Sequence, residues 1–456
     1  MKHGNGRRLL KHLSRLLHLP HLRRAQWLTL VLMLGLLSAL VISSIASCRP
    51  GEPVKPDPPA GRGGMFEPPP AKHPGLKQLP TSLVNIRVKL TARPIESAQA
   101  GSTGACEFRV DGRGAGSSPS AISAAPLRRR DGQWVFQGKS YAGRILEMSA
   151  GASALVQFGA DHYRGVLRFL PAEGDSFIAI NEVDMESYLS GVLAKELWPN
   201  WQPETYRALA IAARTYAYYQ SQAFGTDNAY DVANDQSSQC YGGYSAETAK
   251  SRQAVNSTRG LMLAIDTAQG VQTFRSEYSS CCGGTVNAAA VLRDSPAIAP
   301  FAGGQKCDDC SSASRYRWPT VKVSKAEVYR AMMQAYPSLA AALGQVTDVR
   351  VVAGTAYGRI MWLDIVGKEG VAPIRLRADD LRLVLMRAKA ANSEKIYSMN
   401  CQVRSAGNWI EFSAGKGFGH GVGICQHGAE GKALKGWKAE QIVAFYYPGA
   451  KLARTW

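Results

Sequence analysis

Residues 181–220 read NEVDMESYLSGVLAKELWPNWQPETYRALAIAARTYAYYQ, and this stretch predicts two consecutive helices. Asp184 suits the N-cap of the first helix, because its side chain can accept hydrogen bonds from free backbone N–H groups. Apolar residues then recur at helical spacing up to a Trp-Pro stop. This spacing puts Tyr188, Val192 and Glu196 in one row, so the Glu196 side chain should lie at the rim of a buried face.

The rest of the chain predicts an α+β fold. Pro203 suits the first turn of the second helix, which is rich in alanine and therefore allows close packing. Upstream of the first helix, short alternating runs such as VNIRVKL (84–90) lie between Gly, Ser and Pro clusters and predict a β-rich unit. Downstream, strand-like runs alternate with helices expected at 324–341 and 378–391.

The N-terminal residues predict export and tethering to a membrane. Residues 1–25 form a basic n-region, and 27–47 carry no charge, which is typical of an exported segment whose positive side stays inside. We therefore predict a signal anchor or a lipoprotein signal over 26–48, and IASC ending at Cys48 resembles a lipobox with Cys48 as the lipidated residue. A Pro/Gly-rich linker over 49–82 cannot bury enough apolar surface to fold by itself.

The formal net charge of +19 gives little support to nucleic-acid binding. Seven of the positive charges lie in the first 24 residues, and the rest are dispersed along an exported chain. The remaining surplus favours anionic partners such as a lipid surface or a cell-wall polymer, or is simply a solvated basic surface.

Eight cysteines follow Cys48, and in an oxidising compartment we expect them to form disulfides. An alternative is a structural zinc site, because adjacent cysteines at 281 and 282 and a CDDC motif at 307–310 supply four thiolates: Cys281, Cys282, Cys307 and Cys310.

Glu196 has the sequence setting of a general acid. A carboxyl group partly removed from water has a raised pKa and can donate a proton near neutrality. Cleavage of a glycosidic bond needs such a donor, and one acid suffices when the substrate supplies its own nucleophile. The alternative is a structural role, in which Glu196 caps the helix or pairs with an arginine such as Arg214.

A second motif, GKGFGHGVGICQHGA at 415–429, carries glycine at every second position from 415 to 423. In an extended segment this pattern leaves one backbone face bare, so that another surface can approach closely. That surface is either a sugar chain or the protein's own backbone. His420 and His427 are more simply hydrogen-bonding residues than catalysts, and spacing assigns no Cys/His nucleophile pair.

Three motifs in order resemble the SpoIID/LytB family of stage II sporulation protein D and amidase enhancers. They are the stretch at 181–220, YSSCCGGTVNAA at 278–289, which resembles the Ser/Gly-rich central loop of the family, and the motif at 415–429 followed by AFYYPGAKL at 444–452. The resemblance is weak from about 84 and strong from about 162. It implies a β-rich part over 83–160 followed by a mixed helix/sheet SpoIID-like catalytic domain over 161–456.

The resemblance implies a peptidoglycan lytic transglycosylase that acts on glycan strands lacking stem peptides. Glu196 would protonate the MurNAc–GlcNAc glycosidic oxygen and then accept the proton of the muramic C6 hydroxyl as the 1,6-anhydro ring closes. No cofactor is required for this chemistry. As substrate-binding residues we predict Tyr188, Arg214, Tyr216, Ser280, Gly283, Gly284, His420, Gln426 and Tyr447.

This sequence departs from the family pattern at two places, and two other functions compete with the enzymatic one. Some similar proteins bind zinc through Cys and His near the central loop, but Arg275 stands here where a histidine is expected, and Cys425 before Gln426 suggests a disulfide to Cys401. Amidase enhancers stimulate another wall hydrolase, so the chain is alternatively a non-catalytic glycan-binding module with a cell-wall amidase as partner, or a tethered envelope scaffold.

Overall fold

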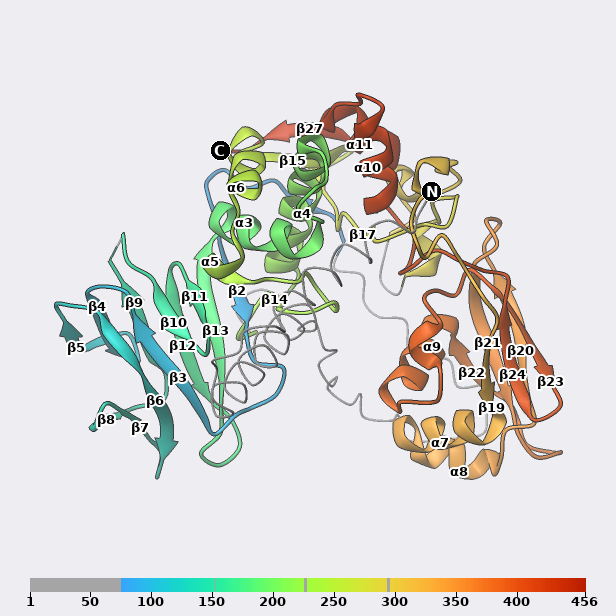
Figure 1. Ribbon diagram of the computed structural model, residues 1–456, viewed down its shortest axis with the longest axis horizontal. Helices are drawn as coiled ribbons and strands as arrows, with labels where there is room; N and C mark the ends of the chain where they lie inside the picture. Colours follow the sequence, from blue (N-terminus) through green and yellow to red (C-terminus); the bar gives the residue numbers. More distant parts are fainter. Residues whose placement is uncertain (1–74, 152, 225–227, 293–295) are drawn as a thin grey trace, which may run out of the picture. The chain divides into compact units, whose positions relative to one another are not determined.

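The computed structural model describes residues 75–151, 153–224, 228–292 and 296–456 (Figure 1). The predicted basic region, the anchor or lipoprotein signal with Cys48, and the linker up to residue 74 lie outside the described residues. Among the helices of the described ranges, none has the length and apolar character needed to span a membrane. The described elements are strands up to Asp184 and a mixture of helices and strands after it, which agrees with the predicted α+β class.

Two antiparallel sheets make up the β-rich N-terminal part (Figure 1). The six-stranded sheet has the order β11 (Asp161–Tyr163), β10 (Val156–Phe158), β3 (Ser97–Ser102), β6 (Ile122–Arg130), β7 (Gln133–Phe136), β8 (Lys139–Ala142). The seven-stranded sheet has the order β14 (Val232–Ala233), β2 (Asn85–Lys89), β13 (Phe177–Asp184), β12 (Val166–Pro171), β9 (Leu146–Ala150), β4 (Cys106–Val110), β5 (Arg113–Ser118), with only the short β14–β2 pair parallel.

Aromatic side chains fill the space between these two sheets. The Trp134 ring of the six-stranded sheet lies 5.4 Å from Phe177 and 6.2 Å from Phe169 of the seven-stranded sheet. All three side chains are fully buried. In the seven-stranded sheet, β12 pairs with β9 and β13 pairs with β2. The sheet therefore combines strands that precede residue 160, where the sequence predicts the end of the β-rich part, with strands that follow it.

The first helix follows β13 without a loop, so the sheet positions it directly. Helix α3 (Met185–Glu196) begins after Asp184, whose carboxylate accepts from the backbone N–H groups of Glu186 and Ser187 at 3.1 Å each. The predicted N-cap is thus confirmed. Tyr188 and Val192 are fully buried, as the helical row required.

Helix α4 begins at Pro203, also as predicted, and packs against α3 and α6. The part of the fold around α3 and α4 also contains α5, α6, a four-stranded sheet of order β1-β16-β15-β27, the parallel pair β17 and β26, and the C-terminal helices α10 and α11. Their bounds are α4 (Pro203–Phe224), α5 (Gly243–Ala246), α6 (Ala249–Ser257), β1 (Lys77–Gln78), β15 (Leu261–Thr267), β16 (Gly270–Thr273), β17 (Tyr278–Ser279), β26 (Ile424–Cys425), α10 (Gln426–Leu434), α11 (Ala439–Tyr446) and β27 (Lys451–Arg454), with short 3-10 turns η1 (Ala289–Val291), η2 (Ala299–Phe301) and η3 (Asp308–Cys310).

Residues 317–416 build a further hydrophobic core between the central loop and the C-terminal motif. It contains the sheets β19-β24-β23 and β20-β21-β22 with three helices, and the pair β18 and β25 at its entry and exit. The bounds are β18 (Arg317–Trp318), β19 (Val321–Ser324), α7 (Lys325–Ala335), α8 (Pro337–Leu343), β20 (Asp348–Gly354), β21 (Ile360–Val366), β22 (Ile374–Arg377), α9 (Ala378–Arg387), η4 (Ser393–Lys395), β23 (Gln402–Ala406), β24 (Trp409–Ser413) and β25 (Gly415–Lys416).

The helix predicted over 324–341 is two helices in the structure. Helix α7 ends before Tyr336, whose backbone leaves the helical region with φ −139° and ψ 63°. Pro337 is the cause, because a proline ring disfavours the α conformation of the residue before it. The proline then serves as the first residue of α8.

Candidate active site

Glu196 is the last residue of α3, and its two carboxylate oxygens accept from two distant segments. Oε1 accepts from the backbone N–H of Cys240 at 3.0 Å. Oε2 accepts from Nε2 of Gln426 at 3.0 Å, and the same amide lies 3.3 Å from the Glu196 backbone oxygen. The side chain is therefore held in one orientation by a loop 44 residues away and by the start of α10.

The surroundings of Glu196 favour a carboxyl group that can exist in both protonation states. Burial raises the pKa of Glu196, while the Cys240 N–H and the Gln426 amide oppose that rise by stabilising the charged form. Within the part of the chain that the structure describes, no ion pair involves Glu196. The structural alternative of a Glu196–Arg214 salt bridge is thus wrong.

A layer of uncharged polar side chains lies behind the carboxylate. Gln239, one residue before Cys240, accepts from the Tyr188 hydroxyl at 3.0 Å and donates to the Tyr278 hydroxyl at 2.9 Å. Burial raises the pKa of both Tyr188 and Tyr278 well above the ordinary value, so both phenols are neutral near pH 7. The network fixes α3 and β17 relative to the loop that carries the Cys240 N–H.

One aromatic side chain close to Glu196 in sequence faces solvent. Trp198 is 62% exposed, whereas Trp201, Tyr206, Tyr216, Tyr218 and Tyr219 are buried. Five of these six aromatic residues therefore belong to the core. Trp198 is thus the one of these six that offers an exposed ring, two residues after the acid in sequence.

The central loop and the C-terminal motif lie side by side at this site. Strand β17 pairs in parallel with β26, with Ser279 opposite Cys425, and the backbone N–H of His427 donates to the Ser280 oxygen at 3.1 Å. His420 Nδ1 accepts from the Val422 N–H, so its Nε2 carries the proton and donates to the Tyr278 oxygen at 2.9 Å. Burial lowers the pKa of His420, which keeps the ring neutral.

The glycines of the C-terminal motif adopt left-handed backbone conformations and not one extended strand. Gly417, Gly419, Gly421 and Gly423 have φ values of 75°, 89°, 72° and 66°. A side chain at Gly417 would meet the Cys281 backbone oxygen at 2.5 Å. The surface that approaches this bare backbone is therefore the protein itself, and not, at these positions, a sugar chain.

Several residues predicted to bind substrate are enclosed by protein. Arg214 has no exposed surface and pairs with Glu186 at 2.6 Å, so it is a structural residue in this conformation. Tyr447 is also fully buried, and its hydroxyl donates to the Glu277 oxygen at 2.6 Å. Tyr216 is 7% exposed and accepts from Gln220 at 3.2 Å.

The central-loop glycines also face protein. Gly283 has φ 80°, and a side chain there would meet the Gly417 N–H at 2.9 Å; Gly284 has φ 111° and faces the Tyr316 hydroxyl. Among the predicted substrate-binding side chains, the structure thus brings Gln426 into direct contact with Glu196, and Tyr188 reaches the site through Gln239.

The arrangement of the cysteines differs both from the predicted disulfides and from the predicted set of four zinc ligands. None of the eight cysteines of the described ranges forms a disulfide, so the expected disulfides, including Cys401–Cys425, are not formed there. Four sulfurs do converge, but they belong to Cys282, Cys307, Cys310 and Cys425, within 4.8 Å of one another. Cys425 replaces Cys281 in this set, because β26 carries it beside the central loop. Cys281 lies next to Cys310 and Cys425 without joining the group.

The Cys/His zinc site that the resemblance suggests does not fit these residues. Arg275, which stands where a histidine was expected, forms an ion pair with Glu277. A guanidinium has no lone pair to offer a metal.

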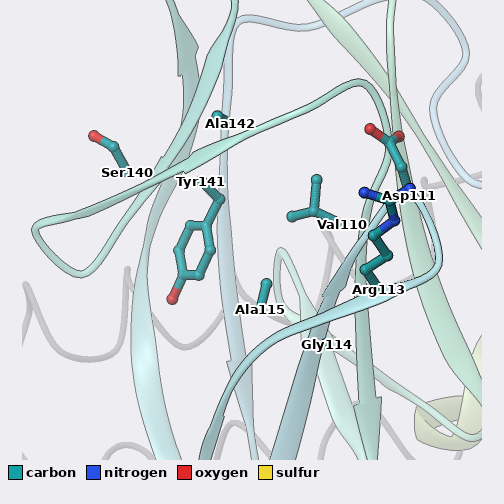
Figure 2. Close-up of a pocket in the computed structure, with 8 residues that line it drawn as sticks. All are labelled: Val110, Asp111, Arg113, Gly114, Ala115, Ser140, Tyr141 and Ala142. Atoms are coloured by element: carbon teal, nitrogen blue, oxygen red, sulfur yellow. The ribbon is translucent and has the colours of Figure 1, made fainter.

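A pocket of about 570 Å³ lies in the β-rich part, away from these residues (Figure 2). Figure 2 shows its lining, which consists of Val110, Asp111, Arg113, Gly114, Ala115, Ser140, Tyr141 and Ala142. The Asp111 carboxylate is engaged by the backbone N–H groups of Arg144 and Ile145, which lower its pKa. The pocket contains none of the residues predicted from the sequence and offers no convergent charged group.

Comparison with known proteins supports the predicted family. Residues 173–264, which include all of α3 and α4, match the family described as SpoIID, stage II sporulation protein. This match and the named relatives support the predicted SpoIID/LytB family. Residues 257–423 also match a domain of unknown function, DUF8618, and this range covers the central loop and the further hydrophobic core of residues 317–416.

Three relatives illustrate the extent of this similarity. An uncharacterized protein of Brachyspira hyodysenteriae is 29% identical over 290 residues, 64% of this chain and 72% of the relative. Stage II sporulation protein D of Bacillus subtilis is 24% identical over 336 residues, 70% and 90% of the two chains. The amidase enhancer of the same organism is 25% identical over 304 residues, which is 58% of this chain but 40% of the enhancer.

Sequence reasoning missed the Cys240 N–H, Gln239 and Tyr278 at the candidate site. A backbone donor has no sequence signature, because every residue except proline carries one. Gln239 and Tyr278 were not chosen because their proximity to Glu196 arises only when two distant segments meet.

Proposed function

We propose that this SpoIID-family protein is a peptidoglycan lytic transglycosylase with Glu196 as its single general acid and base. The similarity to the SpoIID family supports a function related to the cell wall. The observation that supports the enzymatic step is the environment of Glu196: half-buried, free of ion pairs among the described residues, and oriented through both oxygens.

The first step needs the protonated acid. Glu196 donates its proton to the oxygen that joins MurNAc to GlcNAc, the C1–O bond of MurNAc breaks, and positive charge develops at C1. The raised pKa keeps a larger fraction of Glu196 protonated than an ordinary glutamate would have.

The second step needs the carboxylate that the first step leaves. It accepts the proton of the muramic C6 hydroxyl while the C6 oxygen bonds to C1, which closes the 1,6-anhydro ring without water. The Cys240 N–H and the Gln426 amide stabilise this charged form. The opposed effects of burial and of these donors thus serve the two halves of one cycle.

Trp198 is the residue that we assign to hold the glycan next to the acid. Its exposed ring lies two residues beyond Glu196 on the same segment. The flat apolar face of a sugar ring can cover such a side chain and remove it from water. The membrane tether and the linker predicted in residues 1–82 would place this activity in the bacterial cell envelope.

The test uses the full-length protein purified in detergent and glycan strands from which the peptides have been removed. Wild type should release fragments with 1,6-anhydro-muramic ends, detected by mass spectrometry. Glu196→Gln keeps the size and hydrogen-bonding shape of the side chain but cannot donate the proton, so the rate should fall by about 10²–10⁴-fold. Glu173→Gln, at an exposed turn, is the matched control and should retain activity.

A second function is favoured by the similarity to the amidase enhancer. In that case the chain binds glycan and stimulates a separate amidase, or acts as a tethered scaffold, without cutting. Wild type that binds denuded glycan but yields no anhydro product would support the binding module and refute the enzyme. Product release unchanged in Glu196→Gln would remove Glu196 from the mechanism.

A further inference from the structure

The strongest unassigned feature of the molecule is the buried group of four cysteines. Cys282 comes from the central loop, Cys307 directly precedes η3, Cys310 is the last residue of η3, and Cys425 ends β26. Each has at most 1% of its surface exposed, and all four sulfurs lie within 4.8 Å of one another. Three separate segments of the chain thus contribute sulfur atoms to one buried site.

The spacing of the sulfurs fits a single tetrahedral metal ion. Sγ of Cys282 and Sγ of Cys310 are 3.7 Å apart. A disulfide needs about 2.05 Å between the two sulfurs, whereas zinc–sulfur bonds of about 2.3 Å at tetrahedral angles place thiolates about 3.8 Å apart. An iron–sulfur cluster would need a wider cage, because its own iron and sulfide atoms separate the cysteines.

The groups around the sulfurs suit thiolate ligands. The backbone N–H groups of Cys282 and Gly428 both donate to Sγ of Cys425 at 3.3 Å. The Tyr446 hydroxyl lies 3.1 Å from Sγ of Cys307 and can donate to it. Hydrogen bonds of this kind orient metal ligands and disperse their negative charge.

Glycine at position 428 makes room for this arrangement. A side chain there would collide with the sulfur of Cys307 and with the Tyr446 hydroxyl. Cys425 is also the N-cap of α10, so the positive end of the helix dipole adds to the stabilisation of its thiolate.

We propose that Cys282, Cys307, Cys310 and Cys425 bind one structural zinc ion, which holds the Gln426 amide in place beside Glu196. The ion ties the central loop to the start of α10. Gln426 directly follows the ligand Cys425 and contacts Oε2 of Glu196. Zinc binding itself does not depend on the proposed function, and only the importance of the Gln426 position for catalysis rests on it.

The first measurement is the metal content of the full-length protein, purified in detergent without added metal, by inductively coupled plasma mass spectrometry. Wild type should carry about one zinc per chain, and X-ray absorption should give zinc–sulfur distances of about 2.3 Å. Cys282→Ser and Cys425→Ser should lose the metal. Cys281→Ser and Cys401→Ser are the matched controls, because both cysteines are buried but lie outside the group, and both should keep the zinc.

The second measurement tests the link to Glu196 without using activity. Hydrogen–deuterium exchange should be faster in the metal-free protein at the backbone N–H of Cys240, which donates to Glu196, and at that of His427, which donates to Ser280. Exchange in the two N-terminal sheets should not change. If serine variants fail to fold, wild type stripped by a mercurial reagent and refilled with cobalt(II) gives the same information, since cobalt in a tetrahedral thiolate site absorbs visible light.

Several results would overturn the proposal. Wild type without metal, whether with four free thiols or with an intact mass that shows disulfides, would refute the zinc site, and so would iron in place of zinc. Metal lost from Cys281→Ser but kept in Cys425→Ser would refute the ligand set. Loss of zinc without faster exchange at Cys240 and His427 would refute the link to Glu196. Because metal content and exchange are measured without substrate, these outcomes are separate from failure of the proposed enzyme activity.

Discussion

Replacing Arg214 with methionine should destabilise the fold by about 3–5 kcal/mol, because it breaks a buried ion pair. The Arg214 side chain is fully buried and that of Glu186 is 7% exposed, with 2.6 Å between Nη2 and Oε2. The guanidinium also donates to the backbone oxygens of Leu261 at 3.1 Å and Val255 at 3.4 Å.

The magnitude follows from what the substitution leaves behind. Glu186 keeps two donors, the Gly260 N–H at 3.2 Å and Nε1 of Trp456 at 3.0 Å, but no positive charge. An uncompensated buried carboxylate costs several kcal/mol, and carbonyls that lose a donor add to this cost. Since proteins are stable by only about 5–15 kcal/mol in total, the variant should lose a large part of its stability.

Urea unfolding followed by circular dichroism measures the effect. The double variant Arg214→Met with Glu186→Gln should recover much of the lost stability, because no buried charge is left unpaired. Arg109→Met is the matched control: Arg109 and its partner Glu107 are 55% and 65% exposed, so the loss should stay below about 1 kcal/mol. A loss below about 1 kcal/mol for Arg214→Met, with weaker glycan binding, would refute the structural role and restore Arg214 as a substrate contact.

Two further predictions concern the acid and the glycine motif. Because burial raises the pKa of Glu196, the rate of cleavage should decline with rising pH only above the ordinary glutamate pKa. The variant Gln426→Ala removes a hydrogen-bond donor to the charged form of Glu196 and should therefore move this decline to higher pH. A shift of the decline to lower pH in the pH–rate profile would contradict the assignment of Glu196 as the acid. Gly423→Ala should lower the free energy of unfolding in urea by at least about 3 kcal/mol, since φ is 66° and the new methyl group would collide with the Glu277 oxygen. The control Gly436→Ala, where φ is 86° and no atom lies close, should lower it by about 1 kcal/mol. Equal losses of stability in the two variants would show that backbone strain, and not the collision, decides the cost.

Local patterns predicted the helices around the candidate site well. The Asp184 cap, the buried row leading to Glu196 and the start of α4 at Pro203 all agree with the structure, because capping and helical periodicity depend on neighbours within one or two turns. The family resemblance also rested on contiguous motifs and is confirmed.

The partners of these residues could not be predicted, because they come from segments that only the fold brings together. Glu196 was identified as the candidate acid from the sequence, but its contact with Gln426, 230 residues later, and the Glu186 partner of Arg214 depend on how α3, α4 and α10 pack. In the same way, spacing suggested Cys281 as a thiolate ligand, while the pairing of β17 with β26 brings Cys425 there instead. Sequence alone thus determined which residue types could act and where the helices lie. Tertiary structure decided which of them meet, because hydrogen bonds and sulfur ligands act over a few ångströms whatever the distance along the chain.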